Sequence, residues 1–596
     1  MSVKDWQIAL RRQVVEKERL IVTPPEDSEY FTVSNPRSGR NYQVFYKGAR
    51  SKWNYCSCRD FKTNHLGTCK HIEAITAAEG GAYAQKRYAM PDYTTVYLDY
   101  RGERTVKIRI GTHKKSEFQL LAERFFDKNG ELLSDSFMSF ESFMEQARQI
   151  DPRCKVYDDA LEFIVDRRES VRRALLLESM PDDQIAGILK ATRLYPFQVE
   201  GVKFAFRAGS SINADEMGLG KTVQAIATAE LLRSKGLVDS VLILCPTSLK
   251  YQWLNEIRRF TDSSVRVVEG GPVERHNQYA SDEFYKICSY NSVSNDVRYG
   301  AMPMADMIIF DEIQRLKNWD TKISRNISRL HSRYVLALTG TPLENKLTEL
   351  YSVMNYVDPF CLGPYYEFNA DTTVYDESGR VVGYKNLGKV SEMFAGRLIR
   401  RRKSQVAIQM PERSDTNLFV PMTNEQQAIH EEYQTVVARL AHKWRTMHFL
   451  SESDRRRLML SLSMMRMVAD STFILDQKTH FDTKINEVMH IVRQMVSSEN
   501  GKIVIFSQWE RMLRLVAREL ENEQIGYSFL HGGVPSRKRK ALIDNFNGTE
   551  ECHVFLSTDA GATGLNLQSA STAVNLDLPW NPARLEQRIA RIYRRA

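Results

Sequence analysis

The chain has 596 residues, of which 26% are charged and 42% are hydrophobic, and its formal net charge is +9. These fractions are typical of a globular protein, and the length predicts about three or four domains. No apolar run is long enough to span a bilayer and the N-terminus lacks a signal-peptide pattern, so we expect no membrane partner. The charge is compatible with a polyanionic partner without identifying one.

Residues 1–90 form a small basic module with a compact set of metal-binding side chains. Cys56 and Cys58 are followed after ten residues by Cys69 and His71, whereas the other five cysteines are scattered singly. Three thiolates and one imidazole complete a tetrahedral Zn²⁺ site and leave no open position for chemistry. Two tight pairs so close together disfavour the alternative of buried thiols beside an unrelated histidine. All four positions resemble a SWIM zinc finger, which implies binding of nucleic acid or protein.

Residues 91–185 contain no set of side chains that indicates catalysis or ligand binding, and we expect an α+β connector domain there. Residues 94–100 and 105–110 alternate like strands, and residues 158–178 have a helical pattern. Basic pairs such as Arg172 and Arg173 are interpreted as solvated surface.

A glycine turn before a helix is the centre of the remaining chain. Gly218 and Gly220 allow backbone N–H groups to close around an anion, and the helix beginning near Lys221 adds its positive dipole end. Lys221 can reach a β- or γ-phosphate of ATP, and the Thr222 hydroxyl can ligate Mg²⁺. Asp215 stands where the general phosphate-loop pattern asks for glycine, so the loop alone does not decide whether it binds nucleotide.

The segments around this loop add weaker signals. Gln198 is placed to hydrogen-bond an adenine edge, although most such glutamines are surface residues. Residues 241–245 form a continuous apolar run, as in a strand buried in a parallel sheet, and it ends at Thr247 and Ser248. Both hydroxyls are candidates for contacts to a nucleic-acid backbone, because α/β sheets bind ligands at the carboxyl ends of their strands. Trp253 is expected to pack on the core.

A second apolar strand, residues 307–310, ends in Asp311 and Glu312. An acidic pair at the end of a buried strand is what a Mg-ATP site requires: Asp311 for the magnesium shell and Glu312 for polarising the attacking water. The same pair in isolation carries no information, so its place downstream of the glycine loop is what matters.

Residues 215–222, 311–314 and 339–345 occur in the order and form of the Swi/Snf-type ATPases, which are helicase-like translocases of superfamily 2. The resemblance covers residues 192–596, and the family's loop also has an aspartate at position 215. It implies an α/β fold with two RecA-like parallel-sheet lobes and helical protrusions, preceded here by the zinc module and the connector.

The resemblance also implies the domain boundaries. We expect lobe 1 at residues 186–410 with a protrusion and insertion at 346–400, a helical protrusion at 411–480, and lobe 2 at 481–596. The basic run at residues 400–403 is interpreted as facing DNA or solvent. More chain normally follows the last family motif, so we expect a truncated chain or an unusually short member.

Further site residues come from the resemblance. Arg591 and Arg594 match the family's arginine fingers, which stabilise transition-state charge on the γ-phosphate, and Arg588, Arg591 and Arg594 have helical spacing. Ala590 replaces the usual glycine, which is a mild change. The family's nucleic-acid track is predicted to include Thr247, Ser248, Ser507, Thr558 and Asp559.

The resulting hypothesis is a monomeric ATPase that uses ATP and Mg²⁺ to translocate on double-stranded DNA and to displace or remodel bound proteins or reanneal DNA. The alternatives are a strand-separating DNA or RNA helicase, a nucleic-acid scaffold with a dead motor, and a remodeller of a DNA-bound complex such as RNA polymerase. The scaffold with an inactive ATPase is disfavoured because Lys221, Glu312 and Arg591 are all present. A cytoplasmic, nucleoid-associated location in a bacterium or phage-infected cell is expected, or a nuclear one in a eukaryote.

Overall fold

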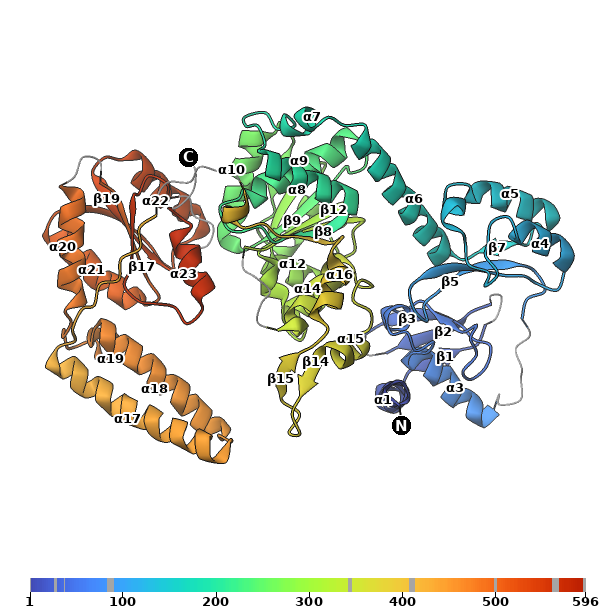
Figure 1. Ribbon diagram of the computed structural model, residues 1–596, viewed down its shortest axis with the longest axis horizontal. Helices are drawn as coiled ribbons and strands as arrows, with labels where there is room; N and C mark the ends of the chain where they lie inside the picture. Colours follow the sequence, from blue (N-terminus) through green and yellow to red (C-terminus); the bar gives the residue numbers. More distant parts are fainter. Residues whose placement is uncertain are drawn as a thin grey trace.

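The computed structural model describes residues 2–25, 29–36, 38–82, 90–340, 346–406, 413–497, 501–559 and 567–592. In Figure 1 the chain runs from two N-terminal modules at the right, through a central body, to a second body at the left. The described helices include none that combines the length and apolar character needed to cross a membrane.

The central body is built on a seven-stranded parallel sheet in the order β10-β11-β9-β12-β13-β8-β16. Its strands are β8 Ser210–Asn213, β9 Val241–Cys245, β10 Val265–Val267, β11 Tyr285–Ser289, β12 Met307–Asp311, β13 Tyr334–Leu338 and β16 Leu398–Ile399. Every residue of β9, β11 and β13 is buried, as their apolar sequences predict for strands covered on both faces.

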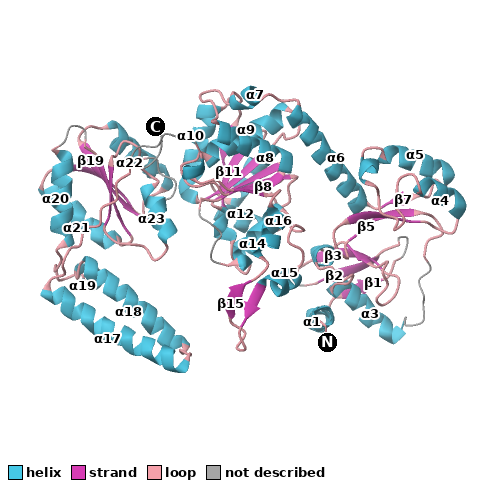
Figure 2. Ribbon diagram, in the orientation of Figure 1, coloured by secondary structure: helices cyan, strands magenta, loops and turns pink. Residues whose placement is uncertain are grey.

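Helices cover both faces of this sheet, as Figure 2 shows. They include α8 Pro196–Ala208, α9 Lys221–Ser234, α10 Lys250–Phe260, α12 Tyr290–Arg298, α13 Lys322–Ile327 and α14 Leu347–Val357. Alternate residues of β12 enter two separate cores: Met307 and Ile309 pack on one side, and Ile308 and Phe310 on the other. Asp311 at the strand's end is therefore fixed by two packed layers.

The second body has a four-stranded parallel sheet in the order β18-β19-β17-β20. Its elements are β17 Ile503–Ser507, β18 Gly526–Leu530, β19 Cys552–Thr558, β20 Thr572–Asn575, α20 Lys484–Val496, α21 Glu510–Asn522, α22 Ser536–Gly548 and α23 Pro582–Ile589. The expected α/β fold class with two RecA-like parallel-sheet lobes is confirmed, and we call the bodies lobe 1 and lobe 2.

Each lobe carries a protrusion. Lobe 1 extends through α15 Tyr365–Thr372, the hairpin β14 Thr373–Tyr375 and β15 Val381–Tyr384, and α16 Leu387–Phe394. Lobe 2 carries the antiparallel pair α17 Asn424–Met447 and α18 Glu452–Asp470, followed by α19 Phe473–Asp476. Arg380 at the lobe 1 hairpin donates through Nη2 to the backbone oxygen of His448, which follows α17, at 3.1 Å.

The N-terminal modules share one hydrophobic core that spans residues 31–164. The first has an antiparallel sheet of β1 Ile21–Thr23, β2 Phe31–Asn35, β3 Arg40–Phe45 and β4 Tyr55–Cys56, with α1 Val3–Glu18, α2 Arg59–Thr63 and α3 Lys70–Ala82. The second has a sheet in the order β6-β5-β7, from β5 Thr95–Asp99, β6 Thr105–Arg109 and β7 Lys155–Val156, with α4 Lys115–Ala122 and α5 Phe140–Ile150. The two modules are consecutive segments of the sequence, but their side chains pack into one hydrophobic core.

The long helix α6 (Asp158–Glu178) runs from the N-terminal modules to lobe 1 (Figure 1). Its residue Glu169 accepts a hydrogen bond of 3.0 Å from the Tyr334 hydroxyl at the start of β13 and pairs with Arg333 at 3.0 Å and Arg173 at 3.8 Å. Arg173 is only 7% exposed and lies over the Tyr334 ring. The expectation that Arg173 is solvated is therefore wrong, because α6 turns that face onto lobe 1.

We expect Glu169→Ala to destabilise the junction by about 2–3 kcal/mol, because it removes two charged contacts and leaves the buried Arg173 without its carboxylate. Differential scanning calorimetry should show an earlier first transition. Glu178→Ala, an exposed change at the end of the same helix, should leave the transition unchanged, and equal melting of the two variants would contradict this account.

Candidate active site and metal-binding cluster

The glycine loop has the backbone that the sequence predicts. Gly218 and Gly220 have φ angles of +89° and +73°, and Gly220 directly precedes α9. A Cβ on Gly220 would lie 2.4 Å from Nε2 of Gln198. Gln198 donates to the Leu219 carbonyl at 3.2 Å and accepts from the Tyr195 backbone N–H at 3.0 Å. The Gln198 side chain therefore packs against the glycine loop and is not exposed at the surface.

Lys221 lies within the loop and beside a second motif. Its Nζ donates to the carbonyls of Asp215 at 2.8 Å and Glu216 at 3.3 Å. A Cβ added to Gly340, which follows β13, would lie 3.4 Å from the same Nζ. Thr222 occupies the first turn of α9 and is half-buried. The ammonium, the helix N-terminus and the end of β13 thus converge at one edge of the sheet.

Asp215, the departure from the phosphate-loop pattern, is fully buried and ion-paired. Its two carboxylate oxygens accept from Arg401, from Nε at 3.0 Å and from Nη2 at 2.5 Å, and the Arg401 backbone N–H adds a bond of 3.0 Å. Gln224 on α9 donates to Asp215 at 3.1 Å and to the Leu219 carbonyl at 3.1 Å. Arg401 also lies over the Phe197 ring at 5.3 Å.

This network corrects the interpretation of residues 400–403 at Arg401, whereas Arg400 and Arg402 are exposed. The Arg401 side chain is 12% exposed and holds the glycine loop, so it faces neither DNA nor solvent. The sequence offered one usable signal: a carboxylate directly after a buried strand needs a cation, because an unpaired buried charge is costly.

The acidic pair lies at the same edge. Trp253, confirmed as a buried residue, also donates from Nε1 to Asp311 at 2.9 Å, and the Tyr290 hydroxyl donates to the Asp311 carbonyl at 2.7 Å. Burial raises the pKa of Asp311 to about 7, and the neighbouring Glu312 carboxylate adds to this shift. Glu312 has a φ of +55°, an uncommon conformation for a residue with a side chain, and it accepts from Gln314. Trp253 and Tyr290 were not predicted as site residues.

The two predicted nucleic-acid residues of lobe 1 follow β9, next to β12 in the sheet. Thr247 is exposed and Ser248 is half-buried in a single 3₁₀ turn, Thr247–Leu249. They therefore share the carboxyl edge of the sheet with the glycine loop and Asp311.

In lobe 2 the predicted residues lie at the ends of β17 and β19. Ser507 is fully buried and donates to Asp577 at 2.5 Å, so its side chain is not available to a nucleic-acid strand. Thr558 is 5% exposed. Asp559 accepts from Nε of Arg588 at 2.6 Å, and Arg588 also binds Asp577 at 3.0 Å. Arg588, 1% exposed, is a structural residue that joins two strand ends.

The predicted arginine fingers follow α23. The helix ends at Ile589, and Arg591 lies in a tighter turn in which its N–H donates to the Arg588 carbonyl at 3.1 Å. The helical spacing of the arginines therefore does not continue as an α-helix through Arg591. Arg591 is 5% exposed. Arg594 and residues 341–345 lie outside the described residues.

The four predicted metal ligands come together in the first module. Cys56 ends β4, Cys58 caps α2, and Cys69 and His71 lie at the start of α3; all four are buried and their ligand atoms lie within 4.8 Å of one another. Nδ1 of His71 is 3.6 Å from Sγ of Cys56 and 3.9 Å from Sγ of Cys69. Zinc bonds of about 2.1 and 2.3 Å in tetrahedral geometry separate ligand atoms by about 3.6–3.8 Å, so the donor set fits Zn²⁺.

The electrostatics of this cluster also fit a metal. Contacts with the Cys56 and Cys69 thiols lower the pKa of Cys58 far below its ordinary value, whereas burial raises the pKa of Cys56 and of Cys69. The Tyr42 ring stacks on His71 with 4.0 Å between centroids. Cys58 is therefore the thiol of this cluster that ionises most readily. A bound cation would also favour ionisation of the buried Cys56 and Cys69 thiols, because its positive charge stabilises thiolates.

Comparison with known protein families decides the assignment of the motor. The model of the SNF2-related domain matches residues 157–493, more than half of the chain. The chain belongs to the SNF2-related family. The helicase conserved C-terminal domain matches residues 483–596, so this SNF2-related chain carries both halves of a helicase-type ATPase.

Several relatives of this SNF2-related chain have descriptive names. The putative ATP-dependent helicase/translocase YwqA of Bacillus subtilis is 30% identical over 72% of this chain and 47% of its own length. The ATP-dependent DNA helicase DDM1 of Arabidopsis thaliana is 26% identical over 69% of this chain and 58% of its own length. The chain spans about half the length of the curated relatives it matches. A solved Sulfolobus solfataricus SWI2/SNF2 ATPase core in complex with dsDNA is 26% identical, covers 67% of this chain and 86% of its own, and has a TM-score of 0.36.

We expect Arg401→Ala to cost about 3–5 kcal/mol of stability in lobe 1, because it leaves the Asp215 carboxylate buried and unpaired beside the glycine loop. Thermal denaturation monitored by circular dichroism measures the loss. Arg402→Ala, which changes the exposed neighbour, should melt like the unaltered protein. A stable Arg401→Ala variant would show that the ion pair does not hold the loop.

Proposed function

We propose that this chain is an ATP-dependent translocase on double-stranded DNA, which remodels or displaces proteins on DNA or reanneals it. The observation that carries this proposal is the meeting of the glycine loop, Lys221 and Asp311 at one sheet edge of an SNF2-related fold, where β8 and β12 lie on either side of β13. Phosphate-binding backbone, a cation and a buried acid are the parts that a Mg-ATP site needs.

Each residue has a proposed role. The loop at Gly218 and Gly220, with Lys221, would bind the phosphates of ATP, and Gln198 would face the adenine. Thr222 and Asp311 would hold Mg²⁺, which when bound neutralises phosphate charge. Glu312 would orient the attacking water, an assignment supported by its strained backbone, since such conformations cluster at active sites.

Lobe 2 would complete the site on closure. Arg591 and Arg594 would stabilise the charge that develops on the γ-phosphate, and reopening after hydrolysis would move the lobes along a DNA strand. Thr247, Ser248 and Asp559 remain candidates for the DNA track, whereas Thr558, which is 5% exposed, is buried like Ser507. Ser507 would act only by fixing the end of β17 through Asp577.

DNA as the partner is supported by relatives named as a DNA helicase and as chromodomain-helicase-DNA-binding proteins, and by the net charge of +9. The second candidate is a strand-separating helicase, which the name of the Bacillus relative favours equally. Release of single strands from a labelled duplex distinguishes the two. A DNA-bound protein complex as target, the monomeric state, the domain boundaries given above and a nucleoid-associated or nuclear location belong to the same proposal.

We expect Glu312→Gln to lower the duplex-stimulated ATPase rate at least about 100-fold while ATP binding is retained, because the amide cannot polarise water. Rates of phosphate release and binding of a fluorescent ATP analogue measure the two effects. Glu274→Gln, an exposed change in lobe 1, should leave both unaltered.

The rates should be compared with duplex DNA, single-stranded DNA and RNA in parallel. Stimulation by duplex DNA beyond the other two is the expected result. A zinc-loaded full-length protein without any duplex stimulation contradicts the translocase proposal.

We also propose that Cys56, Cys58, Cys69 and His71 hold one structural Zn²⁺. The fit of their donor atoms and their complete burial support this role, and four protein ligands leave no position for a substrate.

Metal analysis of purified protein should give about one Zn²⁺ per chain. Cys58→Ser should lose the metal and unfold the first module at lower temperature, because zinc binding energy is folding energy. Cys154→Ser, which alters a buried cysteine outside the cluster, should keep it. Zinc-free protein with an unchanged melting curve would refute the assignment.

A further inference from the structure

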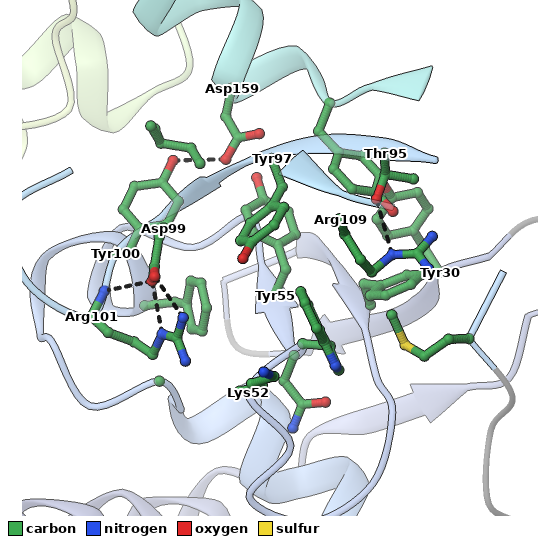
Figure 3. Close-up of a pocket in the computed structure, with 18 residues that line it drawn as sticks. Tyr30, Lys52, Tyr55, Thr95, Tyr97, Asp99, Tyr100, Arg101, Arg109 and Asp159 are labelled. Atoms are coloured by element: carbon green, nitrogen blue, oxygen red, sulfur yellow. Dashed lines mark hydrogen bonds and ion pairs between the residues drawn. The ribbon is translucent and has the colours of Figure 1, made fainter. Parts of the chain in front are cut away.

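A pocket lined with aromatic side chains lies where the first module meets the second (Figure 3). We call it the aromatic pocket, and its walls include Tyr30, Trp53, Tyr55, Tyr97 and Tyr157. Its volume is about 60 Å³, against the roughly 10–15 Å³ that one water molecule needs. The Trp53 and Tyr97 rings stand edge to face, with centroids 5.6 Å apart. The pocket volume is smaller than the roughly 150 Å³ of a cavity that holds benzene, so a flat ring would enter only in part, with its inner edge among these rings.

The polar groups of this pocket favour a neutral or anionic guest. Arg109 directs its three donor groups at neutral oxygens: Thr95 Oγ1 at 3.1 Å and the carbonyls of Pro91 at 2.9 Å and Tyr93 at 2.8 Å. The carboxylate of Asp99 is already bound by Arg101. The Asp99 carboxylate is therefore already paired with a cation, whereas all three hydrogen-bond acceptors of Arg109 are uncharged.

A larger space, which we call the basic cleft, lies on the other side of a shared wall. Leu98, Tyr100 and Asp159 line both spaces, and Tyr100 donates to Asp159 at 2.8 Å (Figure 3). The basic cleft has a volume of about 890 Å³ between α2, α6 and lobe 1. It is lined by seven lysine and arginine side chains against four carboxylates, the basic ones being Arg59, Lys62, Arg104, Arg167, Arg173, Arg333 and Arg397.

Three of the seven cations are paired with carboxylates, Arg173 and Arg333 with Glu169 and Arg397 with Asp358. Arg59 and Arg104 instead have uncharged neighbours. Arg59 donates to the carbonyls of Ser328 at 3.0 Å and Asn355 at 3.2 Å. Arg104 lies over the Phe360 ring at 3.6 Å. Arg173 is buried, and its Nε has no hydrogen-bond partner in the described part of the chain. A concave surface with this balance of charge concentrates anions.

The basic cleft is separate from the proposed ATP site. It is lined by Ser210 at the start of β8, Arg333 just before β13 and Arg397 just before β16, which is the amino edge of the lobe 1 sheet. The glycine loop follows the opposite, carboxyl end of β8. A ligand in the cleft would therefore contact the N-terminal modules and lobe 1 together without entering the nucleotide site.

We propose that the basic cleft and the aromatic pocket together bind a single strand of nucleic acid, with phosphates in the cleft and one base among the rings. A positively charged groove beside aromatic side chains is the combination by which proteins hold unpaired strands. A single strand is favoured over a duplex because only an unpaired base can enter the pocket. The site adds a second nucleic-acid contact outside the motor.

Binding is measured by fluorescence anisotropy of a labelled twelve-nucleotide oligothymidine on the full-length zinc-loaded protein, without ATP and with saturating unlabelled duplex on the motor. Tyr97→Ala should weaken binding roughly 5- to 150-fold, the value of stacking one base. Tyr97→Phe keeps the ring and should bind within about twofold of the unaltered protein.

A strand of the same length that carries abasic sites provides the test without a mutation. It should bind the unaltered protein as weakly as oligothymidine binds Tyr97→Ala, and Tyr97→Ala should cause no further weakening on it. Equal affinity of the unaltered protein for both strands would overturn base insertion.

The cleft is tested by Arg167→Glu, with Arg148→Glu as the control, because Arg148 is exposed on α5 and does not line the cleft. Arg167→Glu should reduce the slope of log affinity against log salt by about 0.7 for each phosphate that is no longer neutralised, and Arg148→Glu should not. Equal effects of the two variants would overturn the cleft as the phosphate site.

These outcomes are independent of the motor proposal. Tyr97→Ala should retain duplex-stimulated ATP hydrolysis, which also shows that the variant is folded. Absence of duplex stimulation in the unaltered protein, with Tyr97-dependent binding of the strand, would reject the translocase and keep this site. The reverse result would reject the site alone.

Discussion

The buried ion pair between Asp215 and Arg401 is the constraint on which the carboxyl edge of the lobe 1 sheet depends. It joins the start of the glycine loop to the segment after β16, some 186 residues later in the chain. Gln224 extends the pair onto α9 and to the Leu219 carbonyl. Because a buried charge must stay paired, the loop, the helix N-terminus and the last strand of the sheet are held as one unit.

Parallel sheets bring the remaining parts together. In both lobes the strands point the same way, so the residues after them meet at one edge whatever their distance in the sequence. In lobe 1 this edge collects the glycine loop, Asp311 and Thr247. In lobe 2 it collects Ser507, Asp559 and Asp577, and there Arg588 neutralises two carboxylates. The same geometry gathers the proposed ATP site at the edge of lobe 1, and at the edge of lobe 2 it gathers carboxylates that are paired with Arg588.

The N-terminal modules and α6 make direct contacts with lobe 1. They share a core with each other, and α6 carries that core to β13 through Glu169. The contacts of Arg59 with lobe 1 enclose the basic cleft at the amino edge of its sheet. The proposed nucleotide site therefore lies at the carboxyl edge of the lobe 1 sheet, and the basic cleft lies at its amino edge.

By itself, the sequence determined the local features. Apolar runs predicted the buried strands, glycines predicted the positive φ angles of the loop, and two close pairs predicted the metal cluster, because each depends on neighbours in the chain. The helix at residues 158–178 agrees with the structure to the residue.

Only the tertiary structure decided which charges are buried. Arg401 and Arg173 belong to basic runs that look solvated, and Ser507 resembles a surface hydroxyl, yet each packs against a residue far away in the sequence. A run of basic residues has the same sequence pattern whether its side chains face water or a buried carboxylate. The free energy that distinguishes these cases comes from desolvation and pairing, which arise only when distant segments pack together.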